Sequence, residues 1–192
     1  IGLWNAWIPA IYWIVIPIIL APLVGKEALK KVLTSVPANK TERRIMNILH
    51  PMTFALLIYP IFVPLKLGTM WFYVGLFVFL LGAAIYTIAI INFITTPLDK
   101  LVTKGVYGVS RHPIHFSYFI MYLGIGIACA SWILLLCSVV YMILQDILHS
   151  AEERFCLERY GDAYREYTNK TPRYFLRGSG IRDRGWKGIT DR

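Results

Sequence analysis

The chain has 192 residues, of which 57% are hydrophobic and 16% are charged, and its formal net charge is +9. A soluble domain of this size carries roughly a quarter charged residues and just under half apolar residues. The apolar residues lie in long runs rather than at helical or strand period, so the composition excludes an ordinary soluble domain and indicates an integral membrane protein.

The first two apolar runs predict two irregular transmembrane helices. Residues 3–24 are long enough to cross a bilayer and carry aromatic residues in their first half. This run lacks a basic leader and a clear cleavage site, so we expect it to be retained as a span. A polar, basic loop over residues 26–44 precedes the second span, residues 45–65. Three prolines lie in each of these two runs and predict kinks.

Three further apolar runs follow, which brings the expected number of transmembrane helices to about five. The third span covers residues 70–94, where Gly75 and Gly82 offer small contact points for neighbouring helices. After a polar loop, residues 113–130 and 131–149 predict a C-terminal helical hairpin. Pro113 suits the first turn of its helix, because the N–H that it lacks would have no partner there.

The distribution of Lys and Arg predicts the orientation of this multi-pass, all-α protein. Both long basic loops and the basic tail are expected to be cytoplasmic, which places the N-terminus outside and the C-terminus in the cytoplasm. The same clustering beside apolar runs suits anionic membrane lipids as partners. No recognisable nucleic-acid-binding module is present, so no nucleic acid is expected as a partner.

The pattern changes after His149. Residues 150–153 fit a capping box, and the Gly161-Asp162 pair reads as the end of one short helix and the N-cap of the next. Tyr160, Tyr164 and Tyr167 share one helical face, which predicts a cytoplasmic helical cap on the hairpin. We therefore divide the chain into an N-terminal helical region (1–94), a catalytic region (95–176) and a basic tail (177–192) on the membrane surface.

Two charged pairs lie at the expected mouth of the hairpin. Arg111 and His112 begin a span, where they either anchor the helix at the interface or hold an anionic ligand together with the free N–H groups of the helix start. Glu152 and Glu153 either form only a capping box or attract a cationic ligand. Together the four side chains offer donors for a carboxylate and acceptors for an ammonium, a sulfonium or a ribose.

Other kinds of site receive less support from the sequence. Asp146, His149 and Glu153 fall at i, i+3 and i+7, with His112 and His115 near the opposite helix end, but repeated histidine boxes and Cys pairs are missing, so no metal is expected. A strained nucleophile elbow and a dinucleotide-binding glycine pattern are also missing.

An ordered set of motifs resembles the isoprenylcysteine carboxyl methyltransferase family. It comprises Leu101-Val102-Thr103-Lys104-Gly105-Val106-Tyr107, then Arg111-His112-Pro113, the hairpin, Glu152-Glu153, and the tyrosine-rich stretch over residues 160–167. Phospholipid N-methyltransferases share this C-terminal pattern. The match extends roughly over residues 98–175.

This resemblance implies a membrane-embedded methyltransferase that uses S-adenosyl-L-methionine, releases S-adenosyl-L-homocysteine and acts on a lipid-like acceptor such as an isoprenylcysteine carboxylate. The implied cofactor-binding residues are Leu101, Val102, Tyr107, Arg111, His112, Pro113, Glu152 and Glu153. Arg173 and Glu153 are the implied catalytic residues, and Arg173 would orient the acceptor carboxylate. His115, assigned with Arg173 to substrate binding, stands where the family usually has Tyr.

Several alternatives stay open at this point. The acceptor can instead be a phospholipid amine. A membrane reductase of the sterol-reductase type has a similar Arg-x-Pro loop, but it uses NADPH and usually has more spans. A non-enzymatic membrane scaffold or small transporter explains the hydropathy and leaves the charged residues without a role. The sequence leaves the acceptor and the oligomeric state undetermined.

Overall fold

The computed structural model describes residues 4–20, 22, 36–97 and 99–174. Most of the expected basic loop over residues 26–44, and all of the basic tail over residues 177–192, therefore lie outside the described residues. Within the described part the chain is helical, with an isolated β-bridge between Asn5 and Pro64.

Three helical segments in the described part are long and apolar enough to cross a membrane. They are α4 with the 3₁₀ helix η2 (Lys40–Phe62), α5 (Met70–Ile94) and α7 (Trp132–Tyr160). The apolar helix α6 (Pro113–Ala128) has 16 residues and is shorter than a typical span. The expectation of an all-helical membrane protein is thus supported, whereas the number of five spans is not confirmed.

The expected first span contains two short helices in place of a single one. These are α1 (Trp7–Ala10) and α2 (Tyr12–Leu20). Backbone hydrogen bonds still cross the junction at Ile11, from the Ile11 N–H to the Trp7 carbonyl and from the Val15 N–H to the Ile11 carbonyl. The two helices together cover about 21 Å, which is less than the hydrocarbon thickness of a bilayer.

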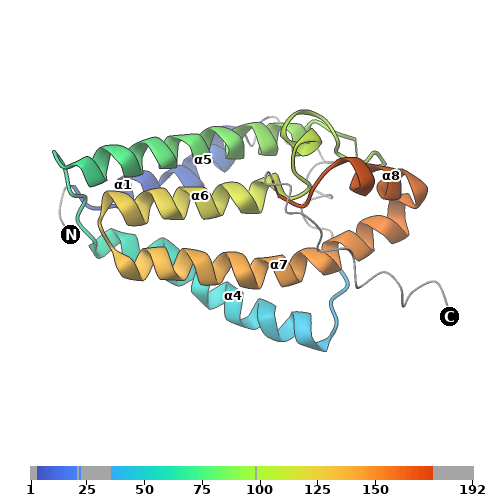
Figure 1. Ribbon diagram of the computed structural model, residues 1–192, viewed down its shortest axis with the longest axis horizontal. Coiled ribbons are helices and arrows are strands. Elements are labelled where there is room, and N and C mark those ends of the chain that lie inside the picture. The colour runs from blue at the N-terminus through green and yellow to red at the C-terminus, as the bar shows by residue number, and fades with distance from the viewer. Residues whose placement is uncertain (1–3, 21, 23–35, 98, 175–192) are drawn as a thin grey trace.

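The helices lie roughly along one direction, with α6 between α5 and α7 and with α4 against α7 (Figure 1). The backbones of α5 and α6 approach most closely at glycines. A Cβ on Gly75 would lie 2.3 Å from the Ala128 backbone nitrogen, and one on Gly124 would lie 2.5 Å from the Phe79 backbone nitrogen. The predicted contact role of Gly75 and Gly82 is confirmed, and Gly124 completes it from the opposite helix.

Helix α4 begins earlier than the sequence predicted, at Lys40 rather than at residue 45. Asn39 and Glu42 form a capping box, in which each side chain accepts a hydrogen bond from the other's backbone N–H. The Glu42 carboxylate also accepts two hydrogen bonds of 2.9 Å from the Arg154 guanidinium of α7. This buried acid therefore starts α4 and joins it to α7.

Helix α7 does not end at His149. It continues to Tyr160, so the predicted capping box at Ser150 is wrong, because that residue lies within the helix. The apolar run ends near His149, where the helix leaves the expected bilayer. The backbone hydrogen bonding of the helix continues past that point to Tyr160. The helix stops at Gly161, whose φ of +53° is disfavoured for other residues. Helix α8 (Asp162–Lys170) follows, and Tyr164 and Tyr167 are its buried residues.

The contact between α5 and α6 predicts a specific sensitivity to a single added methyl group. Gly124→Ala places a Cβ against the Phe79 backbone, which cannot move aside as a flexible side chain would. We expect the free energy of unfolding to fall by about 1–3 kcal/mol. Gly108→Ala is the matched control, because its Cβ would meet its nearest atom at an ordinary 3.5 Å. Thermal unfolding of the detergent-purified variants measures both effects, and equal losses would contradict the close approach.

Candidate functional site

The loop before α6 is folded against α5 and α8. It contains the 3₁₀ helix η3 (Gly105–Gly108), and Gly105 has a φ of +60°, which L side chains rarely adopt. Val102 and Tyr107 pack on Ala89 of α5 in a small hydrophobic cluster. The Tyr167 hydroxyl of α8 donates a 2.6 Å hydrogen bond to the Tyr107 carbonyl. These contacts fix the loop just before Arg111.

The segment after α8 returns to the start of α6. The Arg111 N–H donates to the Pro172 carbonyl at 3.0 Å. The Arg173 carbonyl accepts hydrogen bonds from the Ser110 hydroxyl at 2.9 Å and from the His112 N–H at 3.4 Å. These backbone contacts bring the Arg173 side chain to α7, although it is far from Arg111 in the sequence.

Three basic side chains converge on the Glu153 carboxylate. The Arg173 Nε and Nη2 atoms lie 3.0 and 2.6 Å from its two oxygens. His112 Nε2 lies 3.1 Å away and Arg111 Nη1 3.3 Å away. The Glu153 side chain is 8% exposed. The hypothesis that the acid pair attracts an external cation therefore does not suit Glu153, which the chain's own cations already neutralise.

Glu152 has a different environment. Its side chain is 35% exposed, and one oxygen lies 3.3 Å from His112 Nδ1. The buried His112 imidazole thus faces a carboxylate at each of its two nitrogens. Burial lowers the pKa of His112, but the hydrogen bonds to Glu152 and Glu153 outweigh it and hold the pKa above its ordinary value. His112 therefore bridges the two acids through its two ring nitrogens.

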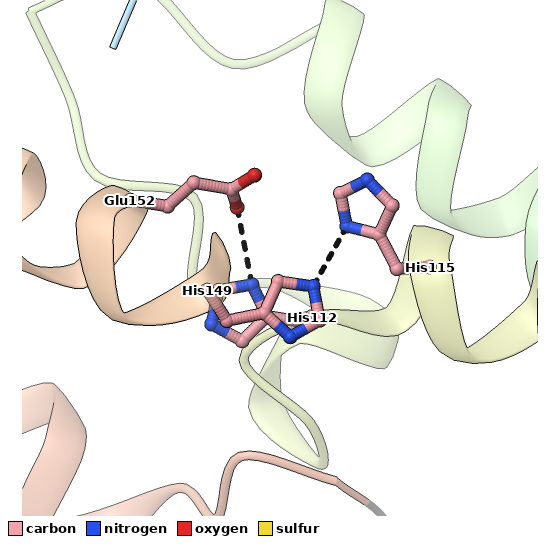
Figure 2. Close-up of side chains that lie close together, drawn as sticks. All are labelled: His112, His115, His149 and Glu152. Carbon is pink, nitrogen blue, oxygen red and sulfur yellow. Dashed lines mark hydrogen bonds and ion pairs between the residues drawn. The ribbon is translucent and has the colours of Figure 1, made fainter. Parts of the chain in front are cut away.

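A second group of histidines adjoins this cluster (Figure 2). The buried His149 ring stacks on His112 with ring centroids 3.8 Å apart. His149 Nε2 lies 3.0 Å from His115 Nδ1, and His149 Nδ1 lies 2.9 Å from the Tyr174 hydroxyl. Tyr174 in turn donates a 2.6 Å hydrogen bond to Asp146. Burial, followed by this hydrogen bond, raises the pKa of Tyr174.

The structure brings together most of the residues that the sequence predicted for the site. Arg111, His112, Glu152, Glu153 and Arg173 form one network, and His115 reaches it through His149. The other predicted residues border this network and do not join it: Leu101, Val102 and Tyr107 belong to the loop, and Pro113 is the buried first residue of α6.

Sequence reasoning did not include Tyr174 in the site and considered His149 only as a metal ligand. A signal for His149 was present, because His149 lies three and four positions before Glu152 and Glu153 and therefore on the same face of α7. Tyr174 follows Arg173 directly, but its partner Asp146 lies 28 residues away, and no local pattern indicates that contact.

Buried donors without partners mark where a ligand can bind. In the described part of the chain, Arg111 Nε and Asn92 Nδ2 are buried and have no hydrogen-bond partner. Leaving such a donor unsatisfied costs about 1–3 kcal/mol, more for a charged group. Arg111 belongs to the charge network of Arg111, His112, Glu152, Glu153 and Arg173, and its Nη1 contacts Glu153. Its Nε can therefore donate a hydrogen bond to an anionic ligand while the contact with Glu153 is kept.

The network predicts that the two adjacent glutamates differ strongly in their contribution to stability. Glu153→Gln leaves three cations without their shared acid, and we expect the free energy of unfolding to fall by about 3–5 kcal/mol. The same substitution at the more exposed Glu152 should cost no more than about 1 kcal/mol. Thermal or denaturant unfolding of both variants without ligand compares them. A Glu153→Gln variant as stable as Glu152→Gln would show that the network is not needed for folding.

Comparison with known proteins identifies the family. The family described as phospholipid methyltransferase matches residues 63–163, just over half of the chain. The matched region contains α5, α6 and α7 with Arg111, His112 and the acid pair, whereas Arg173 lies beyond it. A search among curated proteins finds no match. The broader prediction of a membrane methyltransferase is thereby supported, whereas a specific isoprenylcysteine activity is not. The chain belongs to the phospholipid methyltransferase family.

Proposed function

We propose that the protein binds S-adenosyl-L-methionine at the charge network around Glu153 and transfers its methyl group to a lipid-like acceptor. Methyltransferases of this family generally use this cofactor. The observation that carries the proposal is the buried Arg111 Nε, which has no partner and lies beside the acid pair within the matched region. A site with an unsatisfied guanidinium donor and a partly exposed acid suits a ligand that carries both charges.

The donor and acceptor groups fit the parts of this cofactor. Its methionine portion has a carboxylate, which suits the Arg111 guanidinium, and an ammonium, which suits the outward oxygen of Glu152. Its adenine is flat and largely apolar, and the half-buried Leu101 and the buried Val102 lie in the adjoining loop. In this assignment Glu153 holds Arg111 and His112 in place and does not itself neutralise the ligand.

The cofactor, when bound, supplies an activated methyl group on a sulfonium. The residues of the chain therefore need to bind and orient the two reactants and to exclude water. Arg111 and Glu152 would orient the cofactor through its carboxylate and its ammonium, and His112 fixes Glu152 through its Nδ1 contact.

The contacts of Arg173 favour an amine acceptor over a carboxylate. The resemblance implied that Arg173 orients an acceptor carboxylate, yet its guanidinium is bound by Glu153 and also contacts Asp146 at 3.2 Å. Asp146 is 46% exposed and Glu152 is 35% exposed, so negative side chains are the accessible ones. We therefore propose a phospholipid amine as the acceptor. Such an amine has to lose a proton before it attacks, and an exposed carboxylate can take that proton.

The orientation expected from the sequence gives the site access to the cofactor. With the N-terminus outside and the C-terminus in the cytoplasm, the loop before α6 and helix α8 lie at the cytoplasmic surface. S-adenosyl-L-methionine is soluble and would reach the network from that side. The acceptor would approach from the lipid, and α8 would then serve as the predicted cytoplasmic cap.

Ligand-dependent stability tests the choice of cofactor. A ligand that binds only the folded protein at a hundred times its dissociation constant stabilises it by about 2.7 kcal/mol. We expect S-adenosyl-L-methionine and S-adenosyl-L-homocysteine to raise the melting temperature of the detergent-purified protein, and NADPH to leave it unchanged. In Glu152→Gln the affinity for S-adenosyl-L-homocysteine should fall at least tenfold, about 1.4 kcal/mol. Stabilisation by NADPH alone would instead support a reductase.

A transfer assay distinguishes the two acceptor classes. Purified protein is given methyl-labelled S-adenosyl-L-methionine with either phosphatidylethanolamine vesicles or a farnesylated cysteine derivative. We expect label in the phospholipid, with a rate that rises with pH as the amine loses its proton. Label in the farnesylated cysteine alone would refute the amine proposal and restore the role of Arg173 as a carboxylate ligand.

A further inference from the structure

We propose that His112, His115, His149 and Glu152 form a binding site for a divalent transition-metal ion of the zinc class, which adjoins the proposed cofactor site and shares Glu152 with it. One ligand atom from each of these residues lies within 4.8 Å of all the others. His112 and His115 come from the start of α6, and His149 and Glu152 from α7 (Figure 2). An ion held by all four would therefore join the two helices at the mouth of the hairpin.

Two of the separations between these atoms are close to those of a tetrahedral site. Zinc bonds of 2.0–2.1 Å place neighbouring ligand atoms about 3.3 Å apart. His149 Nε2 and His115 Nδ1 are 3.0 Å apart, and His112 Nδ1 and the Glu152 oxygen are 3.3 Å apart. These are two opposite edges of the tetrahedron. The remaining separations are at most 4.8 Å, so they need to shorten by no more than about 1.5 Å when an ion binds.

The hydrogen bonds of Tyr174 determine which nitrogen of His149 is free to bind a metal. Tyr174 has one hydroxyl hydrogen, and it is donated to the Asp146 carboxylate. The Tyr174 oxygen therefore accepts a hydrogen bond from Nδ1 of His149. In the neutral ring this leaves a lone pair on Nε2, and that atom faces His115. A metal ion would take the place of the proton now shared between the two histidines.

Outer contacts of the kind that support metal-bound histidines are also present. Metal-binding histidines usually donate their other N–H to a carboxylate or a similar acceptor, which fixes the ring. His112 Nε2 has Glu153 at 3.1 Å, and His149 Nδ1 has Tyr174, which is bound to Asp146. Asp146 and Glu153, considered as direct metal ligands from the sequence, thus occupy the outer positions. Glu152, which was not among the candidate ligands from the sequence, joins His112, His115 and His149 in the inner positions.

The ligand set indicates the class of metal. Three imidazole nitrogens and one carboxylate oxygen suit zinc and neighbouring first-row ions, whereas calcium and magnesium prefer oxygen ligands. Four protein ligands close a tetrahedral site, which is typical of a structural ion. Glu152 can bind the ion through one oxygen and keep the other for the cofactor. The site also gives a role to His115, which stands where the resembling family usually has Tyr.

Metal content tests this proposal independently of enzyme activity. The protein is purified in detergent with an affinity tag that lacks histidines, stripped with EDTA, dialysed against zinc or cobalt(II), and freed of excess metal. We expect one zinc per chain by atomic emission, the visible absorption bands of tetrahedral cobalt(II), and a higher melting temperature with zinc. The double variant His115→Leu/His149→Leu should lose the metal. His50→Leu, which changes an exposed histidine on α4, should keep it.

A second variant maintains the test if the double variant does not fold. Glu152→Gln replaces a ligand at a partly exposed position, and we expect it to fold and to bind zinc at least tenfold more weakly while the cobalt spectrum shifts. Absence of stoichiometric zinc from the wild-type protein would overturn the proposal. Zinc affinity and a cobalt spectrum unchanged in both variants would overturn it as well, because the metal would then be bound elsewhere.

Discussion

A single buried carboxylate, that of Glu153, determines how the polar end of this protein is arranged. A carboxylate with 8% exposure is stable as an anion only when it is paired, and the chain supplies Arg111, His112 and Arg173 for this purpose. These three cations come from the loop before α6, from the start of α6 and from the segment after α8. Because all of them contact the same two oxygens, the loop, the hairpin and the C-terminal segment are held in one relative position. The partly exposed Glu152 contacts this network through His112, and the unpartnered Arg111 Nε is buried within it.

The apolar part of the structure holds this network at the end of a helical bundle. Helices α5 and α6 pack through glycines, so their backbones approach more closely than side chains would otherwise permit. Large apolar side chains such as Phe77, Leu80 and Leu136 are exposed on the outer faces of α5 and α7. In a soluble protein such a surface would favour aggregation, whereas in a membrane it faces lipid. The proposed arrangement therefore places the charged site beside a surface from which a lipid acceptor can approach.

The sequence predicted those features that depend on local composition. The boundaries of α5 are those expected, residues 70–94, because a continuous apolar run is bounded there by Thr69, which caps the helix, and by Thr95. The end of α7 was wrong by eleven residues, because hydropathy reports where a helix leaves the bilayer and does not report where its backbone hydrogen bonds end. For the same reason the start of α4 was missed: the buried Glu42 belongs to a polar stretch, and its partner Arg154 is 112 residues away.

The order of the motifs in the sequence correctly grouped Arg111, His112, Glu152 and Glu153. It gave no indication that Arg173 is bound to Glu153, since that contact depends on the path of the chain after α8.

The most direct test of the account is to locate the bound cofactor in the chain. Wild-type protein in detergent is irradiated with labelled S-adenosyl-L-methionine, digested, and the labelled peptides are identified by mass spectrometry, with excess unlabelled S-adenosyl-L-homocysteine as the competitor. The account predicts competitor-sensitive label in the peptides that contain the loop before α6 and the part of α7 around Glu152 and Glu153. Competitor-sensitive label confined to residues 1–94 would contradict it, because the cofactor would then bind away from the charge network.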